Sequence, residues 1–218
     1  MKTLVIIPSR LSATRLPGKP LLKINGLSII SHVFRKAEEA NIGEVIVAAE
    51  DKEIVIDVEK NGGQAILTSN QHTTGTDRIY EAFRKLNRSD VELIINLQGD
   101  EPMIDTGDII RLKKQMQNSR SNIGTLASVI KDHDLYNNEN VVKVITKESL
   151  GESNFPEALD FKRKISKTNQ NIYHHLGIYC YEPEILQKFV SYNQSKNEIK
   201  NKLEQLRALD NNIEIKVA

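Results

Sequence analysis

In the first half of the chain, short apolar runs alternate with amphipathic stretches, and this alternation restricts the possible folds more than any other feature. The apolar runs are rich in β-branched residues and end at turn residues, as expected of strands buried on both faces. They predict strands at residues 3 to 8, 45 to 48, 65 to 67 and 93 to 95. The stretches between them predict helices at residues 28 to 40, 52 to 61 and 77 to 87. This order predicts an α/β fold with a Rossmann-like, mixed, mostly parallel sheet and helices on both faces.

The loop after the first strand is a candidate anion-binding site. Residues 6 to 20 read I-I-P-S-R-L-S-A-T-R-L-P-G-K-P, in which Arg10, Arg15 and Lys19 alternate with small residues. Guanidinium groups hold phosphate oxygens through paired hydrogen bonds, and lysine adds a mobile positive charge. The loop is neither a Walker A sequence nor a G-x-G-x-x-G sequence. The residue types alone therefore leave two interpretations open, a phosphate-binding loop and a solvated basic turn.

The loop after the fourth strand, N-L-Q-G-D-E-P at residues 96 to 102, carries a candidate metal ligand. Parallel sheets bind ligands beyond the carboxyl ends of their strands, so this loop and the basic loop are expected on one rim. Mg²⁺ is commonly held by one or two carboxylates together with substrate phosphates, which makes Asp100 the candidate. The competing interpretation is an ordinary turn at Gly99 and Asp100.

The segment H-T-T-G-T-D-R at residues 72 to 78 opens the third predicted helix. Thr74, followed three residues later by Asp77, predicts an N-cap with an acidic residue in the first turn. This capping role does not exclude ligand binding by the same segment.

The second half has a different organisation. Strands are predicted at residues 123 to 129, 141 to 145 and 174 to 181, and the polar composition of residues 147 to 171 predicts a segment that includes mobile backbone. Four apolar residues at helical spacing predict one amphipathic helix, with three polar residues beside them on its side. The apolar residues are Ile199, Leu203, Leu206 and Leu209, and the polar ones are Glu204, Gln205 and Arg207. By themselves, His175 and Glu204 indicate only a partly buried histidine and a solvated helix charge.

Composition excludes several classes of function. The 218 residues include 30 Lys and Arg against 29 Asp and Glu, so a formal charge of +1 gives no overall attraction to nucleic acid or an anionic membrane. The single cysteine, Cys180, excludes an internal disulfide, and with no Cys/His zinc spacing it favours a reducing cytoplasm. The apolar run before Pro8 is too short for a signal peptide or a membrane span. A single cytoplasmic domain, or one domain with a small appendage, is therefore expected.

Five strings resemble the motifs of the sugar nucleotidyltransferases, most closely those of the cytidylyltransferases that activate 3-deoxy-manno-octulosonate (Kdo). They are R-L-S-A-T-R-L-P-G-K-P-L, H-T-T-G-T-D-R, N-L-Q-G-D-E-P, H-L-G-I-Y and L-E-Q-L-R, in the family's order. In the second string, Thr74 and Asp77 stand where the family usually has serine and glutamate.

The resemblance implies a nucleotidyltransferase (GT-A-like) domain over residues 1 to 218, with a nucleotide-binding half at 1 to 130 and a sugar-binding and dimerisation half at 131 to 218. It implies Mg²⁺-dependent transfer of CMP from CTP to the anomeric hydroxyl of Kdo, for lipopolysaccharide synthesis, by a homodimer. The implied catalytic residues are Arg10, Arg15, Lys19 and Asp100, with Asp100 as the metal ligand. The implied substrate-binding residues are Pro8, Ser9, Ser12, Thr74, Gly75, Thr76, Arg78, Gln98, Arg163, His175, Tyr179, Glu204 and Gln205.

Two departures from the family pattern leave alternatives open. The usual F-S-R-x-x-I-P segment is F-K-R-K-I at residues 161 to 165, so only Arg163 carries over, as a sugar contact. The sequence ends at Ala218, where the family continues into V-D-T-x-E-D-L, whose aspartate is expected to be a second metal ligand. The alternatives are a cytidylyltransferase for another acid sugar, such as sialic acid, and an inactive nucleotide-binding paralogue.

Overall fold

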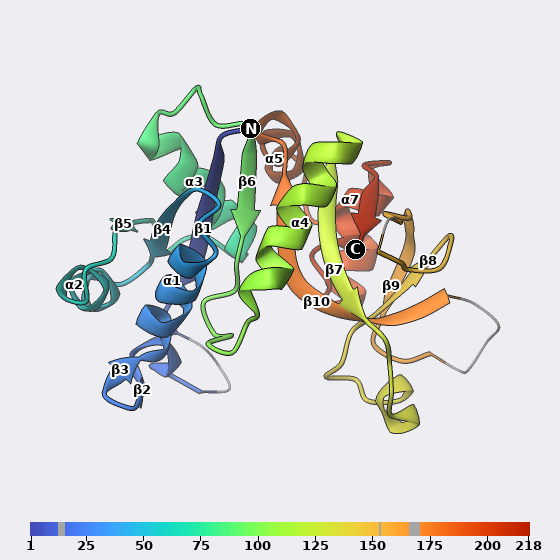
Figure 1. The fold of residues 1–218 in the computed structure, drawn as a ribbon, viewed down its shortest axis with the longest axis horizontal. Coiled ribbons are helices and arrows are strands. Elements are labelled where there is room, and N and C mark those ends of the chain that lie inside the picture. Colours follow the sequence, from blue (N-terminus) through green and yellow to red (C-terminus); the bar gives the residue numbers. More distant parts are fainter. Residues whose placement is uncertain (13–15, 153, 166–170) are drawn as a thin grey trace. The chain divides into compact units, whose positions relative to one another are not determined.

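The structure of the protein is a computed structural model that describes residues 1–12, 16–152, 154–165 and 171–218 (Figure 1). The chain forms two compact units, Met1–Lys113 and Lys114–Ala218. The expected functional division at residue 130 stays a prediction.

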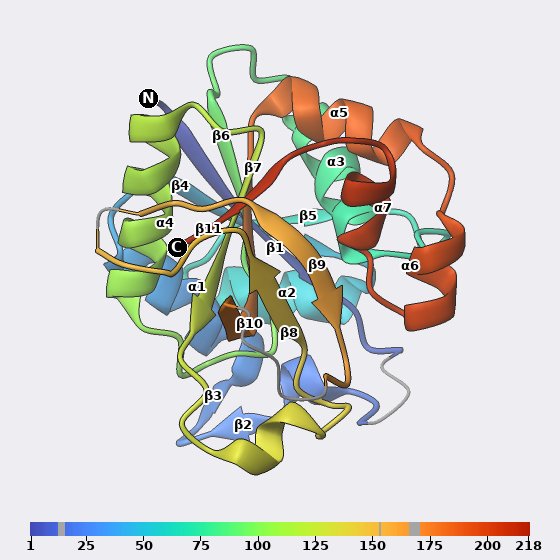
Figure 2. The same cartoon turned by 90° about the vertical axis from the view of Figure 1, so that its right-hand side faces the viewer.

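The first unit is built on four parallel strands in the order β6-β1-β4-β5. Their bounds are β1 (Thr3–Ser9), β4 (Glu44–Ala49), β5 (Ala65–Leu67) and β6 (Leu93–Asn96), and the connecting helices are α1 (Ile29–Glu39), α2 (Lys52–Lys60) and α3 (Gly75–Leu86). Helices α1 and α2 contact each other on one face, and α3 packs against β1 on the other, as right-handed crossovers require (Figure 1, Figure 2). The strands and helices expected in this half, and the α/β class, are confirmed.

Strand β1 is the centre of this unit. Its four apolar residues, from Leu4 to Ile7, are each at most 1% exposed, because strands flank β1 on both sides and helices cover both faces. The strand was expected to stop at Pro8 but continues to Ser9. Proline is tolerated there because the ladder with β6 ends at Ile6, so Pro8 pairs only on the β4 side.

Several elements of the first unit were not predicted. They are the 3-10 helix η1 (Lys19–Leu21), the two strands β2 (Lys23–Ile24) and β3 (Leu27–Ser28), and helix α4 (Thr106–Ser119), which runs into the second unit. The sequence does contain a signal for this hairpin, the pair Asn25-Gly26, because Asn-Gly is the preferred pair for two-residue hairpin turns. Both residues have the positive φ that such turns require.

The second unit contains a mixed sheet in the order β11-β7-β10-β8-β9, in which only the β11–β7 pair is parallel among the described residues. The strand bounds are β7 (Ile123–Ser128), β8 (Lys143–Thr146), β9 (Ala158–Lys162), β10 (Asn171–Tyr181) and β11 (Ile215–Val217). The helical elements are η2 (His133–Tyr136), α5 (Pro183–Ser191), α6 (Lys196–Asn201) and α7 (Leu206–Asp210). The strands expected near residues 123, 141 and 174 are present.

The polar segment at residues 147 to 171 contains a strand that was not predicted. Strand β9 lies within this segment, pairs with β8, and buries Ala158 and Phe161. The ladder shifts register between Ile145 and Thr146, and this irregularity breaks the simple alternation that marks a strand in a sequence.

The prediction of one amphipathic helix across residues 199 to 209 was wrong. Lys202 adopts a left-handed conformation with φ of 53° and ends α6, and α7 begins only at Leu206. Arg207, expected on the side of that helix, is 2% exposed and paired with Glu198. This buried ion pair overrides the helical spacing of the apolar residues.

Within the described residues, no helix is both long enough and apolar enough to cross a membrane.

The predicted N-cap of α3 is confirmed, since the Thr74 hydroxyl accepts a hydrogen bond from the Asp77 backbone N–H at 3.2 Å. We expect Thr74→Ala to lower the free energy of unfolding by about 1 kcal/mol. Denaturant unfolding measures this change. Thr73→Ala is the matched control, because Thr73 is exposed and its hydroxyl reaches Asp77 only at 3.4 Å. Equal losses in the two variants would contradict the capping role.

Candidate active site

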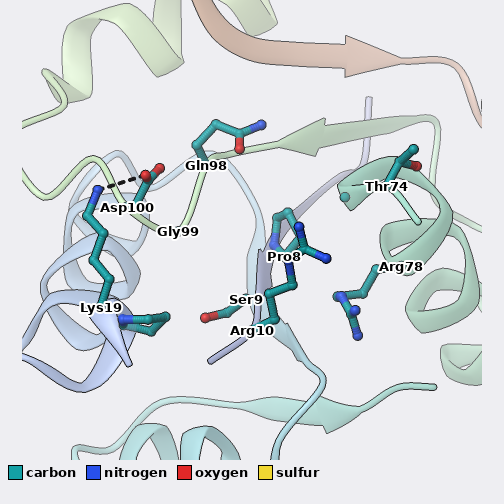
Figure 3. A pocket seen from close by; sticks show the side chains of 11 residues that line it. Pro8, Ser9, Arg10, Lys19, Thr74, Arg78, Gln98, Gly99 and Asp100 are labelled. Carbon is teal, nitrogen blue, oxygen red and sulfur yellow. Dashed lines mark hydrogen bonds and ion pairs between the residues drawn. The ribbon is translucent and has the colours of Figure 1, made fainter. Parts of the chain in front are cut away.

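A pocket of about 370 Å³ lies at the carboxyl ends of β1 and β6 in the first unit. The loop after β1, the start of η1, the first turn of α3 and the loop after β6 contribute its walls (Figure 3). The lining residues are Pro8, Ser9, Arg10, Lys19, Pro20, Thr74, Gly75, Arg78, Gln98, Gly99 and Asp100. The two loops predicted to share one rim of the sheet therefore do meet.

An ion pair joins these two loops. Lys19 Nζ donates to Asp100 Oδ2 at 2.7 Å, with the side chains 31% and 53% exposed (Figure 3). An exposed pair of this kind adds little stability, at most about 1 kcal/mol. Both charges are therefore accessible to ligands that bind more strongly, an anion at Lys19 and a cation at Asp100.

Arg78 lines the pocket but is already bonded within the protein. Its guanidinium donates to Thr68 Oγ1 at 2.7 Å and to the Ser69 carbonyl at 3.0 Å, and it forms an ion pair with Glu50. Arg78 is 2% exposed and its charge is compensated by Glu50, so its main role in this structure is to build the wall of the pocket. Arg10, in contrast, is exposed at the pocket edge.

Two features of the pocket suit an anion. The start of α3, a helix of 12 residues, faces the pocket at Thr74 and Gly75, where the backbone N–H groups of a helix start and the helix dipole favour negative charge. Ser9 is 6% exposed, and its Oγ has no hydrogen-bond partner among the described residues. A buried hydroxyl without a partner is costly, so a ligand acceptor at this position would stabilise the site.

Two predicted residues of this half, Ser12 and Thr76, lie outside the pocket lining. Ser12 donates to Glu50 at 3.3 Å, and Thr76 is buried. Arg15 lies outside the described residues. Sequence reasoning missed Pro20 and Gly99 as lining residues, although both lie within quoted motifs.

The donor set at the pocket fits a metal that arrives with a phosphate ligand. Among the described residues, no group of three or more His, Cys, Asp or Glu side chains is arranged to hold a metal ion. Asp100 supplies one accessible carboxylate at the rim. Mg²⁺ is readily held by a single carboxylate when phosphate oxygens and water supply its remaining ligands.

The second unit gathers another group of predicted residues. The rings of His175 and Tyr179 lie 5.4 Å apart on β10, and His175 Nε2 is 3.0 Å from Thr125 Oγ1. Burial, with a smaller effect from His174, lowers the pKa of His175 to about 3. Burial, the Tyr181 phenol and the Glu204 carboxylate raise the pKa of Tyr179 well above its ordinary value. Near neutral pH both groups are therefore uncharged hydrogen-bonding partners.

Gln205 and Arg163 complete the predicted set in this unit. Gln205 is 8% exposed at the start of α7. Arg163 donates to the carbonyls of Asn201 at 2.9 Å, Lys202 at 2.9 Å and Glu139 at 3.0 Å. Its guanidinium thus fixes the end of α6.

The model of the Cytidylyltransferase family matches residues 4–215. The chain belongs to this family. It is 43% identical, over 100% of its own length and 89% of the relative's, to the 3-deoxy-manno-octulosonate cytidylyltransferase of Thermodesulfovibrio yellowstonii. It is 44% identical to the enzyme of the same name from Rhodopseudomonas palustris, over 99% of this chain and 88% of that one.

Solved structures agree with this assignment. CMP:2-keto-3-deoxy-manno-octonic acid synthetase, solved in complex with CTP, matches with a TM-score of 0.89 and 34% identity, over 100% of this chain and 89% of that one. A cytidylyltransferase from Leptospira borgpetersenii shares the fold, with a TM-score of 0.63 at 17% identity, over 100% of this chain and 76% of that one.

The pocket of this cytidylyltransferase depends on a close backbone approach at Gly99. A Cβ atom at this position would lie 2.8 Å from the Pro8 carbonyl oxygen and 3.2 Å from Ile30. We expect Gly99→Ala to lower the free energy of unfolding by about 1–3 kcal/mol, the usual cost of overpacking. Gly75→Ala is the matched control, because its Cβ would meet Pro8 only at an ordinary 3.4 Å. Thermal unfolding measures the stability of both variants. A Gly99→Ala variant as stable as Gly75→Ala would refute the close approach.

Proposed function

We propose that this cytidylyltransferase transfers CMP from CTP to the anomeric hydroxyl of Kdo, releasing pyrophosphate. The observation that carries the proposal is one pocket that combines exposed cations, a helix N-terminus and an accessible carboxylate, in a chain similar over its full length to relatives named for this activity. Homodimer formation, a cytoplasmic location and a role in lipopolysaccharide synthesis belong to the same proposal.

The first unit would bind the nucleotide. Arg10 and Lys19 would hold the phosphate oxygens, together with the N–H groups at the start of α3 and the Ser9 hydroxyl. Arg15, Pro8, Gln98 and Arg78 are proposed as further contacts, Arg78 acting through the wall that it builds with Glu50. Positioning and charge neutralisation are the main contributions that a protein makes to nucleotidyl transfer.

In the transfer step, the anomeric hydroxyl of the sugar releases its proton to water and its oxygen forms a bond to the α-phosphorus, while the bond from that phosphorus to the pyrophosphate oxygen breaks. Lys19 and Arg10 would stabilise the charge that develops on the leaving pyrophosphate. Mg²⁺, held by Asp100 and phosphate oxygens, would neutralise part of the same charge when bound.

The second unit would bind the acid sugar. Uncharged His175 and Tyr179 suit sugar hydroxyls, which accept and donate hydrogen bonds without needing an ion. Glu204 and Gln205 would add further hydrogen bonds. Arg163 is proposed as a sugar contact, because three of the five N–H donors of its guanidinium bind carbonyls and the others can reach a ligand.

Incubation with CTP, Mg²⁺ and either Kdo or sialic acid tests the function, with pyrophosphate release as the readout. We expect turnover with Kdo, and loss of turnover by at least about 10²-fold in Asp100→Asn, which replaces the carboxylate with an amide of similar shape. Preferred turnover of sialic acid would indicate the other acid-sugar activity, and CTP binding without turnover would indicate the inactive paralogue. An Asp100→Asn variant with wild-type, Mg²⁺-dependent turnover would contradict the role of Asp100.

Nucleotide binding tests the basic loop separately. We expect Lys19→Ala to weaken CTP binding by about tenfold or more and CMP binding much less, because the lost charged hydrogen bond would reach the β- or γ-phosphate. Calorimetric titration at saturating Mg²⁺ measures both dissociation constants. Lys36→Ala, which removes another exposed ion pair of 2.7 Å, should change neither. Equal losses for CTP and CMP would show that Lys19 does not contact the terminal phosphates.

A further inference from the structure

A buried ion pair joins α6 to α7 in the second unit. Arg207 donates from Nε to Glu198 Oε2 at 2.9 Å and from Nη2 to Oε1 at 2.6 Å, and both side chains are at most 4% exposed. The Glu198 carboxylate also accepts from the Ser195 backbone N–H at 3.1 Å and from Gln194 Nε2 at 3.2 Å. A buried, bidentate pair with this many hydrogen bonds holds one geometry, because any other arrangement would leave a buried charge unpaired.

The break between the two helices is what allows this pair to form. In one continuous helix, residues 198 and 207 would lie on opposite faces and about 14 Å apart along the axis. Left-handed Lys202 instead begins a turn over residues 202–205, here called the 202–205 turn. The backbone N–H groups of Lys202 and Leu203 both bond to the Glu198 carbonyl, and the Arg207 N–H bonds to the Glu204 carbonyl at 3.0 Å. Each end of the turn is thus attached to a member of the ion pair.

Arg207 is also connected to Tyr179 through a row of rings. Its guanidinium lies 4.8 Å from the centre of the Phe189 ring, whose centre lies 6.2 Å from that of Tyr181. Tyr181 is stacked on Tyr179, with ring centres 6.0 Å apart. After burial and Tyr181, the Glu204 carboxylate is a further cause of the raised pKa of Tyr179, so the 202–205 turn carries Glu204 into the surroundings of that phenol.

We propose that the Arg207–Glu198 pair positions the sugar-binding residues of this enzyme, although neither side chain needs to touch the sugar. This inference rests on the proposed function, in which Glu204, Gln205 and Tyr179 bind the acid sugar. The pair is bonded to both ends of the 202–205 turn, and Arg207 also contacts Phe189, the first ring of the row that leads to Tyr179. Glu204 and Gln205 therefore keep a fixed distance from Tyr179. Arg207 and Glu198 are positioning residues for the sugar and not for the nucleotide.

Two variants separate positioning from stability. Glu198→Gln combined with Arg207→Met removes both charges, so no buried charge is left unpaired. Glutamine at the third helical position still supports the capping box with Ser195, and methionine offers a thioether to the Phe189 ring in place of the guanidinium. Arg207→Lys keeps the charge but loses the planar, bidentate fork. Lys147→Met, which removes an exposed ion pair of 3.6 Å with Glu157, is the matched control.

The measurements are Tm, the dissociation constant of CTP, and kcat/KM for Kdo at saturating CTP and Mg²⁺, all on the full chain. We expect the double variant to stay folded and to bind CTP as the wild type does, while its kcat/KM for Kdo falls by about 10²-fold, the loss that a displacement of about 1 Å causes. Arg207→Lys should lie between the double variant and the wild type, and the control should match the wild type.

Several outcomes would overturn the inference. If the double variant folds and keeps the wild-type kcat/KM for Kdo, the pair has only a structural role. The same conclusion follows if the double variant does not fold and Arg207→Lys is fully active. If the double variant loses CTP affinity by the same factor as kcat/KM for Kdo, the pair does not act specifically on the sugar-binding residues. A wild-type chain that does not turn over CTP and Kdo would refute the proposed function and this inference together, whereas an active wild type with unaffected variants would refute this inference alone.

Discussion

The parallel pairing of β1 with β6 holds the candidate active site together. It brings the ends of two strands that are far apart in the sequence to one edge of the sheet, and both strands are almost fully buried. Beyond the last paired residue, the loop after β6 stays against the end of β1, because Gly99 lets the backbone approach the Pro8 carbonyl. The ion pair of Lys19 and Asp100 that joins the loops is exposed and adds little stability, so a ligand that replaces it costs the fold little.

The sequence was informative where local patterns and tertiary packing agree. The apolar runs of β1, β4 and β6 and the N-cap at Thr74 could be predicted because a buried strand and a helix start each have a local signature. The Lys19–Asp100 contact could not be predicted from residue types, because it depends on which strands are neighbours. Arg78 was placed near the ligand only by resemblance, and its ion pair with Glu50 appears only in three dimensions.

The second unit was harder to predict because buried charges determine its loops. Arg207 has the spacing of a solvated helix residue, yet its pairing with Glu198 requires the helix to break. Lys143 is fully buried and donates to three carbonyls, those of Asn138, Val141 and Arg163. Burial, with a smaller effect from the Arg163 charge, lowers the pKa of this lysine. Sequence periodicity describes apolar packing well, but it does not indicate which cation will be enclosed by carbonyl groups.

The burial of His175 has a consequence for the response of this enzyme to acid. In the unfolded chain an imidazole takes up a proton near its ordinary pKa of about 6.5, whereas in the folded state the pKa is about 3. Between these values the unfolded state binds more protons, so the contribution of His175 to stability is complete above the higher value and is lost as the pH falls toward the lower one. The second unit thus carries a built-in sensitivity to mild acid, a cost of keeping an uncharged ring where the sugar is proposed to bind.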